Sequence, residues 1–198
     1  MISTSGLYRL ILLVILITTI PTAIGMWSDK AMISAKVKTG EARIYITSYK
    51  ALAFKEQKGK GCISSDGEVT FSNNNRSMSV IFTNISQGWY GWVGLVISNE
   101  GVFPRTIGRP SVIAPINISI SRFLYGPFRA PGTSGIWGDV NICVMTSNLA
   151  SSGNPFPGNV DTGSIYLQPS YKAIAWVFLN YTGVENLSSI SITIGVAG

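Results

Sequence analysis

Apolar and polar residues alternate with a period of two along most of the chain after residue 25, in short runs separated by Gly, Asn and Pro. Such alternation is typical of β-strands with one buried face, and no run of about twelve residues follows the 3.6-residue period of an amphipathic helix. The runs predicted to be strands are 31–37, 42–47, 69–71, 77–85, 89–98, 102–112, 116–123, 140–145, 172–180 and 189–196. The pattern therefore predicts an all-β chain, a single β-sandwich of about nine to eleven strands.

Two of these runs, 89–98 and 172–180, are apolar on both faces, which predicts central strands that are covered on both sides. The stretches 125–138 and 146–163 are rich in Gly and Pro and are predicted to be long surface loops. We find no internal repeat and no second domain.

The first 25 residues are predicted to be a cleaved signal peptide. Arg9 precedes an apolar run at 10–20, Pro21 ends it, and Ala23 and Gly25 form a small-x-small cleavage site. A membrane anchor is the alternative, but eleven helical residues rise only about 17 Å against a hydrocarbon core of roughly 30 Å. A pilin-type leader cut near Gly6 would need a longer apolar helix. We therefore expect an extracellular protein that meets the membrane only during export, with a mature chain starting at residue 26.

Export gives the two cysteines a role. In an oxidising compartment Cys62 and Cys143 can form a disulfide that closes a loop of about 80 residues. By lowering the entropy of the unfolded chain, such a bond would stabilise the folded state by roughly 4–5 kcal/mol. Two separate buried thiols are the alternative. Two cysteines without any histidine cannot make a structural zinc site, so no metal and no cofactor is expected.

Export also gives meaning to the N-x-S/T sequons, which are acceptor sites for N-linked glycans. With only 12% charged residues and 46% apolar ones, the chain needs neutral polar groups, sugar or another protein to cover its surface. In the run 116–123, Asn117 is expected on the face opposite Ile116, Ile118 and Ile120. The five predicted sites are Asn75, Asn84, Asn117, Asn180 and Asn186.

Composition argues against an enzyme. Without histidine there is no Ser-His-Asp triad, no Cys-His pair and no HExxH zinc helix. A glycosidase would need two neighbouring carboxylates, and most of the acidic residues stand beside predicted turns, where they shape loops or face solvent. These candidates are Asp66, Glu68, Glu100, Asp139, Asp161 and Glu185.

The net charge of +6 raises nucleic acid as a partner. The basic residues are scattered except for Lys55, Lys58 and Lys60, which we interpret as a solvated loop, so nucleic acid is not expected as the primary partner. Carbohydrate binding through exposed aromatic residues is a further alternative. Trp176 is predicted to be buried. Trp89 and Trp92 lie three residues apart in one strand, so their side chains are predicted to lie on opposite faces of it. Trp137, in a Gly-rich stretch, is left as the stacking candidate.

Several short motifs follow one another along the first half of the chain. The first group is Trp27-Ser-Asp, the alternating run 31–37, Thr39-Gly40 and Ala42-Arg-Ile-Tyr-Ile. The second is Asn84-Ile-Ser-Gln-Gly88, the strand through 93–97, and Asn99-Glu-Gly101 leading to Pro104-Arg-Thr-Ile107. In this order they resemble the mature N-terminus, and then the turn, strand and second turn, of the TasA/camelysin-like family of biofilm-matrix proteins and its archaeal bundling pilins. Gln87 stands where the family prefers Pro. The resemblance covers residues 26–107 except an insertion at 50–76.

The resemblance implies a jelly-roll-like β-sandwich pilin domain at 40–198, preceded by a donor strand at 26–39 that inserts into the next subunit. Gly40 would be the pivot between them. It implies a homopolymer, an extracellular fibre whose filaments bundle laterally and link cells in a biofilm. Pattern cannot separate this donor strand from an ordinary first strand that pairs within its own chain. The donor side chains would be Trp27, Ala31, Ile33, Ala35 and Val37. Two-faced hydrophobicity suggests as acceptors Trp89, Val93, Leu95, Ile97, Ile174, Trp176 and Phe178.

Overall fold

A computed structural model describes residues 43–57, 61–66, 68–71, 75–129 and 135–197 of the 198. These residues all belong to one compact unit that spans 40–198. The predicted signal peptide, the donor-strand residues Trp27, Ala31, Ile33, Ala35 and Val37, and Gly40 lie outside the described residues.

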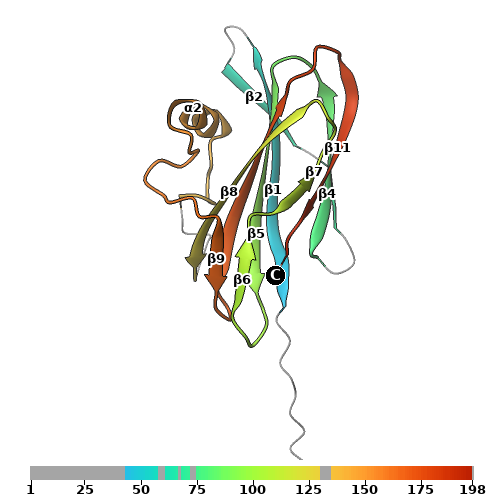
Figure 1. Cartoon of the computed structure of the whole chain (residues 1–198). Coiled ribbons are helices and arrows are strands. Elements are labelled where there is room, and N and C mark those ends of the chain that lie inside the picture. The colour runs from blue at the N-terminus through green and yellow to red at the C-terminus, as the bar shows by residue number, and fades with distance from the viewer. Residues whose placement is uncertain (1–42, 58–60, 67, 72–74, 130–134, 198) are drawn as a thin grey trace, which may run out of the picture. The chain divides into compact units, whose positions relative to one another are not determined.

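The described residues form antiparallel sheets and one helix, which lies in the long segment between β8 and β9 (Figure 1). Sheet order is β2-β1-β5-β10-β8 in the five-stranded sheet, β3-β4-β11-β7 in the four-stranded sheet and β6-β9 in the two-stranded sheet. The strands are β1 (Ile44–Gln57), β2 (Gly61–Asp66), β3 (Glu68–Phe71), β4 (Ser77–Ile85), β5 (Trp89–Asn99), β6 (Arg105–Gly108), β7 (Ser111–Ile113), β8 (Ile118–Phe128), β9 (Ser164–Leu167), β10 (Lys172–Tyr181) and β11 (Leu187–Gly195). The predicted all-β class is confirmed, and the arrangement is consistent with a β-sandwich.

The inner core lies between the five- and four-stranded sheets. In β11, Ile190, Ile192 and Ile194 are buried while Ser191 and Thr193 are exposed, so the alternation predicted for 189–196 is confirmed. Side chains of β5 such as Leu95 join the same cluster from the facing sheet. Burial of one face from each sheet is the main stabilising contribution to such a fold.

A second core covers the outer face of the five-stranded sheet. Trp92 and Trp176 lie there, T-shaped at 6.2 Å between ring centroids, and both are fully buried. Ile136 and Met145, from the segment after β8, pack over them. The central strands β5 and β10 are therefore covered on both faces, as their two-faced hydrophobicity predicts.

Residues 140–145 form no strand, contrary to the prediction. Residues 142–145 are instead the first turn of helix α2 (Ile142–Ser152). Its N-cap Asn141 accepts hydrogen bonds from the backbone N–H groups of Cys143 and Val144. Gly153 ends the helix with φ of 72° and donates its N–H to the Leu149 carbonyl. The helix buries only Ile142 and Met145, so its apolar period is too weak to reveal it.

Other boundaries also differ from the prediction. Strand β1 runs on to Gln57 instead of ending at residue 47, so Lys55 belongs to a strand and not to a loop. Residues 146–152 of the predicted loop 146–163 are helical, and strands β2 and β9 were not predicted. The run 102–112 is split into β6 and β7, because the chain turns at Arg109-Pro110 and passes from the two-stranded to the four-stranded sheet. Strand β8 runs on to Phe128, into the predicted loop 125–138, because its pairing with β10 continues from Ile118↔Tyr181 to Phe128↔Lys172.

Candidate assembly surface

One side of the sandwich has an incompletely paired strand. Strand β11 pairs with β4 from Leu187 to Gly195, but with β7 only from Thr193 to Gly195. Along Leu187–Ile192, β11 therefore has no partner on its β7 side among the described residues. Unpaired strand edges present rows of N–H and C=O groups that can bind a further strand.

The inner core is also only partly covered around this edge. Four apolar residues that pack half-buried against the inner core belong to the surrounding elements: Val112, Ala114, Ile120 and Leu187. Residues 114–117 leave the four-stranded sheet after β7 and cross to β8 in the other sheet, so both sheets end here. We call the Leu187–Ile192 edge and these four residues the open side. A strand with one apolar and one polar face would complete it.

Exposed isoleucines border the open side. Ile113 is 73% exposed and Ile116, in the crossing segment, is 98% exposed. The prediction that Ile116 shares a buried face with Ile118 is wrong, because β8 begins only at Ile118. Asn117 is exposed as predicted, and its carbonyl accepts the Thr182 N–H at 2.9 Å.

The predicted acceptor strands lie elsewhere. Strand β5 is paired with β1 on one side and β10 on the other, and β10 is paired with β5 and β8. Neither has an edge free for another strand. Trp89, Val93, Leu95 and Ile97 are inner-core residues, whereas Ile174, Trp176 and Phe178 belong to the outer core. Apolar character on both faces marks a strand in the middle of a covered sheet, so the acceptor assignment does not fit this fold.

The exposed aromatic residue expected for carbohydrate stacking is also misplaced. Trp137 is only 9% exposed, its ring centroid lies 5.8 Å from that of Trp176, and Lys50 Nζ lies 5.4 Å above its ring. Lys50 Nζ also donates to the Trp137 carbonyl at 2.7 Å. Trp137 is thus part of the outer core, and the carbohydrate alternative loses the residue on which it depended. Trp89 and Trp92 do face opposite sides, as predicted.

The end of the sandwich where β5 ends and β1 begins is organised by Asn99, which is fully buried. Its Nδ2 donates to the carbonyls of Phe103 at 2.8 Å and Leu167 at 2.9 Å, and its Oδ1 accepts the Gly101 N–H at 3.0 Å. One side chain therefore fixes the turn after β5 and the end of β9. The sequence indicates only the Asn-Glu-Gly turn and gives no sign of these longer-range bonds.

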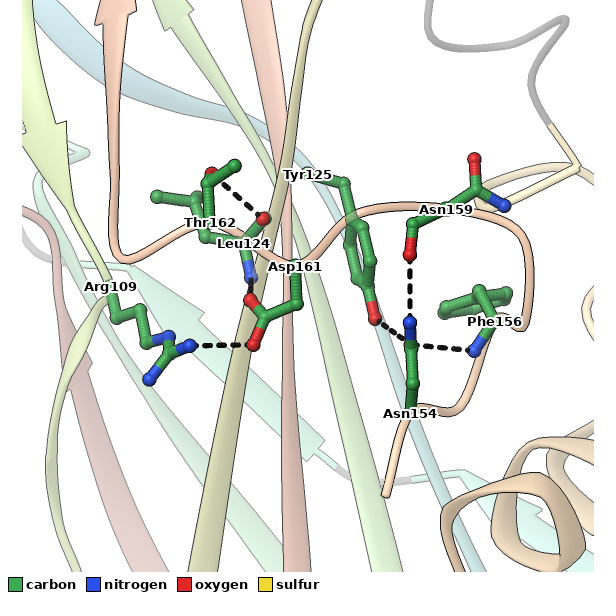
Figure 2. A network of polar contacts seen from close by, with 8 residues as sticks. All are labelled: Arg109, Leu124, Tyr125, Asn154, Phe156, Asn159, Asp161 and Thr162. Carbon is green, nitrogen blue, oxygen red and sulfur yellow. Dashed lines mark hydrogen bonds and ion pairs between the residues drawn. The ribbon is translucent and has the colours of Figure 1, made fainter. Parts of the chain in front are cut away.

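A polar network fastens the segment after α2 to the edge of β8 (Figure 2). Asp161 accepts the Leu124 N–H at 2.8 Å and pairs with Arg109 at 2.6 Å, while the Thr162 N–H binds the Leu124 carbonyl. Burial, and to a lesser extent the Asp161 carboxylate, raises the pKa of Tyr125, with Arg109 opposing. The phenol stays protonated and donates to Asn154 Oδ1 at 2.7 Å. Because the N–H and the carbonyl of Leu124 are both bonded to residues 161–162, β8 cannot pair with a further strand at this point.

Cys143 lies in the first turn of α2 and is disulfide-bonded. Cys62 lies in β2, but its side chain is outside the described residues. The Cys62–Cys143 pairing therefore stays a prediction. It would tie α2, which covers the outer core, to the edge strand of the sheet beneath it.

The sequons differ in accessibility. Asn75, Asn84, Asn117 and Asn186 are exposed, whereas Asn180 is half-buried within β10, between its partners Tyr90 and Ser119 on neighbouring strands. A glycan at Asn180 would have to leave from the middle of a sheet. We expect glycopeptide mass spectrometry of the folded protein, exposed to an oligosaccharyltransferase and lipid-linked glycan, to find Asn180 unoccupied and exposed sequons modified. Occupancy of Asn180 equal to theirs would contradict this.

Among the described residues, no group of three or more His, Cys, Asp or Glu side chains could hold a metal ion. Within the same residues no helix is long and apolar enough to cross a membrane. No protein-family model, no curated protein and no solved structure compared with this chain matches it.

Proposed function

We propose that this chain is the structural subunit of an extracellular fibre. In this proposal residues 26–39 of one subunit complete the jelly-roll-like sandwich of the next, and the filaments bundle laterally to link cells in a biofilm. The observation that carries the proposal is the open side, where β11 is unpaired along Leu187–Ile192 and the inner core is only partly covered.

The N-terminal segment has the pattern that the open side requires. Ala31, Ile33, Ala35 and Val37 alternate with polar or unbranched residues, so a strand over 31–37 would turn one face to the inner core and the other to solvent. The run 31–37 is also similar in length to the open edge Leu187–Ile192. Strand addition of this kind combines main-chain hydrogen bonds with burial of alternate side chains.

The composition and the exposed surface support lateral contacts between filaments. Only 12% of residues are charged, and large apolar side chains such as Ile116 and Val184 are exposed. Such surfaces favour association between neighbouring filaments, and N-linked glycans at exposed sequons would keep the unassembled subunit soluble.

The test is a substitution on the apolar face of residues 31–37, in the whole exported chain. Ile33→Asp is expected to abolish filaments seen by negative-stain electron microscopy, because a carboxylate cannot be buried against the inner core without a partner. The matched control is Ser34→Asp, on the opposite face of the same strand, which should leave filaments intact.

The folded state of each variant is checked by thermal unfolding of the unassembled protein. Filaments that persist in Ile33→Asp, or an unmodified chain that stays monomeric at all concentrations, would contradict the proposal. A monomeric unmodified chain that Ile33→Asp destabilises would indicate that residues 31–37 pair within their own chain.

A further inference from the structure

Two apolar side chains are exposed at the end of the sandwich where β1 begins. Val102 is 65% exposed and Phe103 is 53% exposed, in the connection between β5 and β6. Their backbone is held in place, since Asn99 Nδ2 donates to the Phe103 carbonyl and Asn99 Oδ1 accepts the Gly101 N–H. We call residues 100–104 the apolar turn. It presents apolar side chains from a fixed backbone, as preorganised binding surfaces do.

The described part of the chain begins beside this turn. The Glu100 N–H donates to the carbonyl of Arg43 at 2.8 Å, and Ile44, the first residue of β1, is the register partner of Asn99. Figure 1 shows β1 beginning at the end of the molecule where β5 passes into β6. Whatever residues 26–39 bind must therefore be reached from the apolar turn.

Chain length limits how far away that binding partner can be. Six residues lie between Val37 and Ile44, so the chain takes seven steps of at most about 3.5 Å each, or about 25 Å in all. A second copy whose sandwich holds residues 31–37 must then lie close to this end of the first copy.

We infer that the apolar turn is a contact between successive subunits, with Val102 and Phe103 buried against a second copy of the chain. This inference rests on the proposed function, because it assumes that residues 31–37 pair in another copy. It adds a rigid contact to the strand exchange, so that each subunit is held at a fixed angle to the next. The occupant is a second copy, because the copy that holds residues 31–37 lies within the reach of about 25 Å that the connection allows.

The test compares the critical concentration for filament formation of the Val102→Ser/Phe103→Ser double variant with that of the unmodified chain. We expect a rise of about tenfold or more, equivalent to about 1.4 kcal/mol per added subunit. The matched control is Val144→Ser, on the outer surface of α2, where Val144 is also 53% exposed. Its critical concentration should stay unchanged, and thermal unfolding should be unaltered in both variants.

Filaments that form equally well from the double variant would overturn the inference, and so would an equal rise in Val144→Ser. Either result leaves the proposed function standing if Ile33→Asp still abolishes filaments. A second measurement uses Phe103→benzoylphenylalanine in filaments assembled from mixed ¹⁴N and ¹⁵N chains. Photo-crosslinks between light and heavy copies are expected, and crosslinks confined to single copies would overturn the inference. An unmodified chain without filaments would overturn the proposed function itself.

Discussion

Asn99→Asp is expected to lower the free energy of unfolding by about 3 kcal/mol or more. The side chain is fully buried, and its Nδ2 supplies the hydrogen bonds to the carbonyls of Phe103 and Leu167. An aspartate has the same shape but no N–H groups. Two carbonyl oxygens would then face a buried carboxylate instead of a donor, which adds repulsion to the loss of both bonds.

Chemical denaturation at neutral pH measures this effect, with Asn117→Asp as the control. Asn117 is exposed, and both bonds described at this residue are accepted by its backbone carbonyl, so its substitution should change the stability by less than about 0.5 kcal/mol. Equal stabilities of the two variants would show that the buried amide does not hold the turn and β9 together. Both proteins should come from a host without N-glycosylation, because Asn117 lies in a sequon.

The apolar pattern was sufficient to predict strands β4, β5, β8, β10 and β11, but it identified only the start of β1. In β11 the alternation of Ile190, Ile192 and Ile194 with serine and threonine identifies the inner face, and in β5 and β10 continuous apolar character identifies strands covered twice. These predictions succeed because successive side chains of a strand point to opposite faces. The sequence of one strand therefore shows by itself whether one face or both faces are apolar.

Features that depend on distant residues were missed. Helix α2 is indicated only by its caps, Asn141 and Gly153, since the layer it forms needs few apolar side chains. Burial of Trp137 depends on Trp176, which lies 39 residues further along the chain. The open side likewise results from β7 ending at Ile113, because residues 114–117, which would continue the pairing along Leu187–Ile192, cross instead to β8 in the other sheet. Strand neighbours are set by topology, so hydrophobicity alone could not identify which strand edges stay unpaired.

The outer core requires a glycine in the middle of β5. A Cβ atom built at Gly94 would lie 2.7 Å from Cη2 and Cζ3 of Trp176 and 2.9 Å from Cζ3 of Trp137. The Trp176 ring cannot retreat easily, because it is fully buried and its Nε1 donates to the Ile136 carbonyl at 3.0 Å. Trp92 and Phe156 also pack against it, with ring centroids 6.2 Å and 6.0 Å away. The Trp176 indole thus occupies the space that a side chain at position 94 would need.

Gly94→Ala is therefore expected to lower the free energy of unfolding by about 2–3 kcal/mol, because overpacking moves Trp176 and Trp137 out of their arrangement. Denaturant unfolding followed by tryptophan fluorescence measures both the stability and the environment of the indoles. Gly108→Ala, in β6, is the control, since a Cβ there meets nothing within 4 Å and its φ lies outside the range that favours glycine. It should be neutral or slightly stabilising, because alanine reduces the conformational entropy of the unfolded chain. A Gly94→Ala protein as stable as the Gly108→Ala protein, with unchanged fluorescence, would mean that the outer core can shift to accept a methyl group. The layer of α2 would then be loosely packed on the sheet.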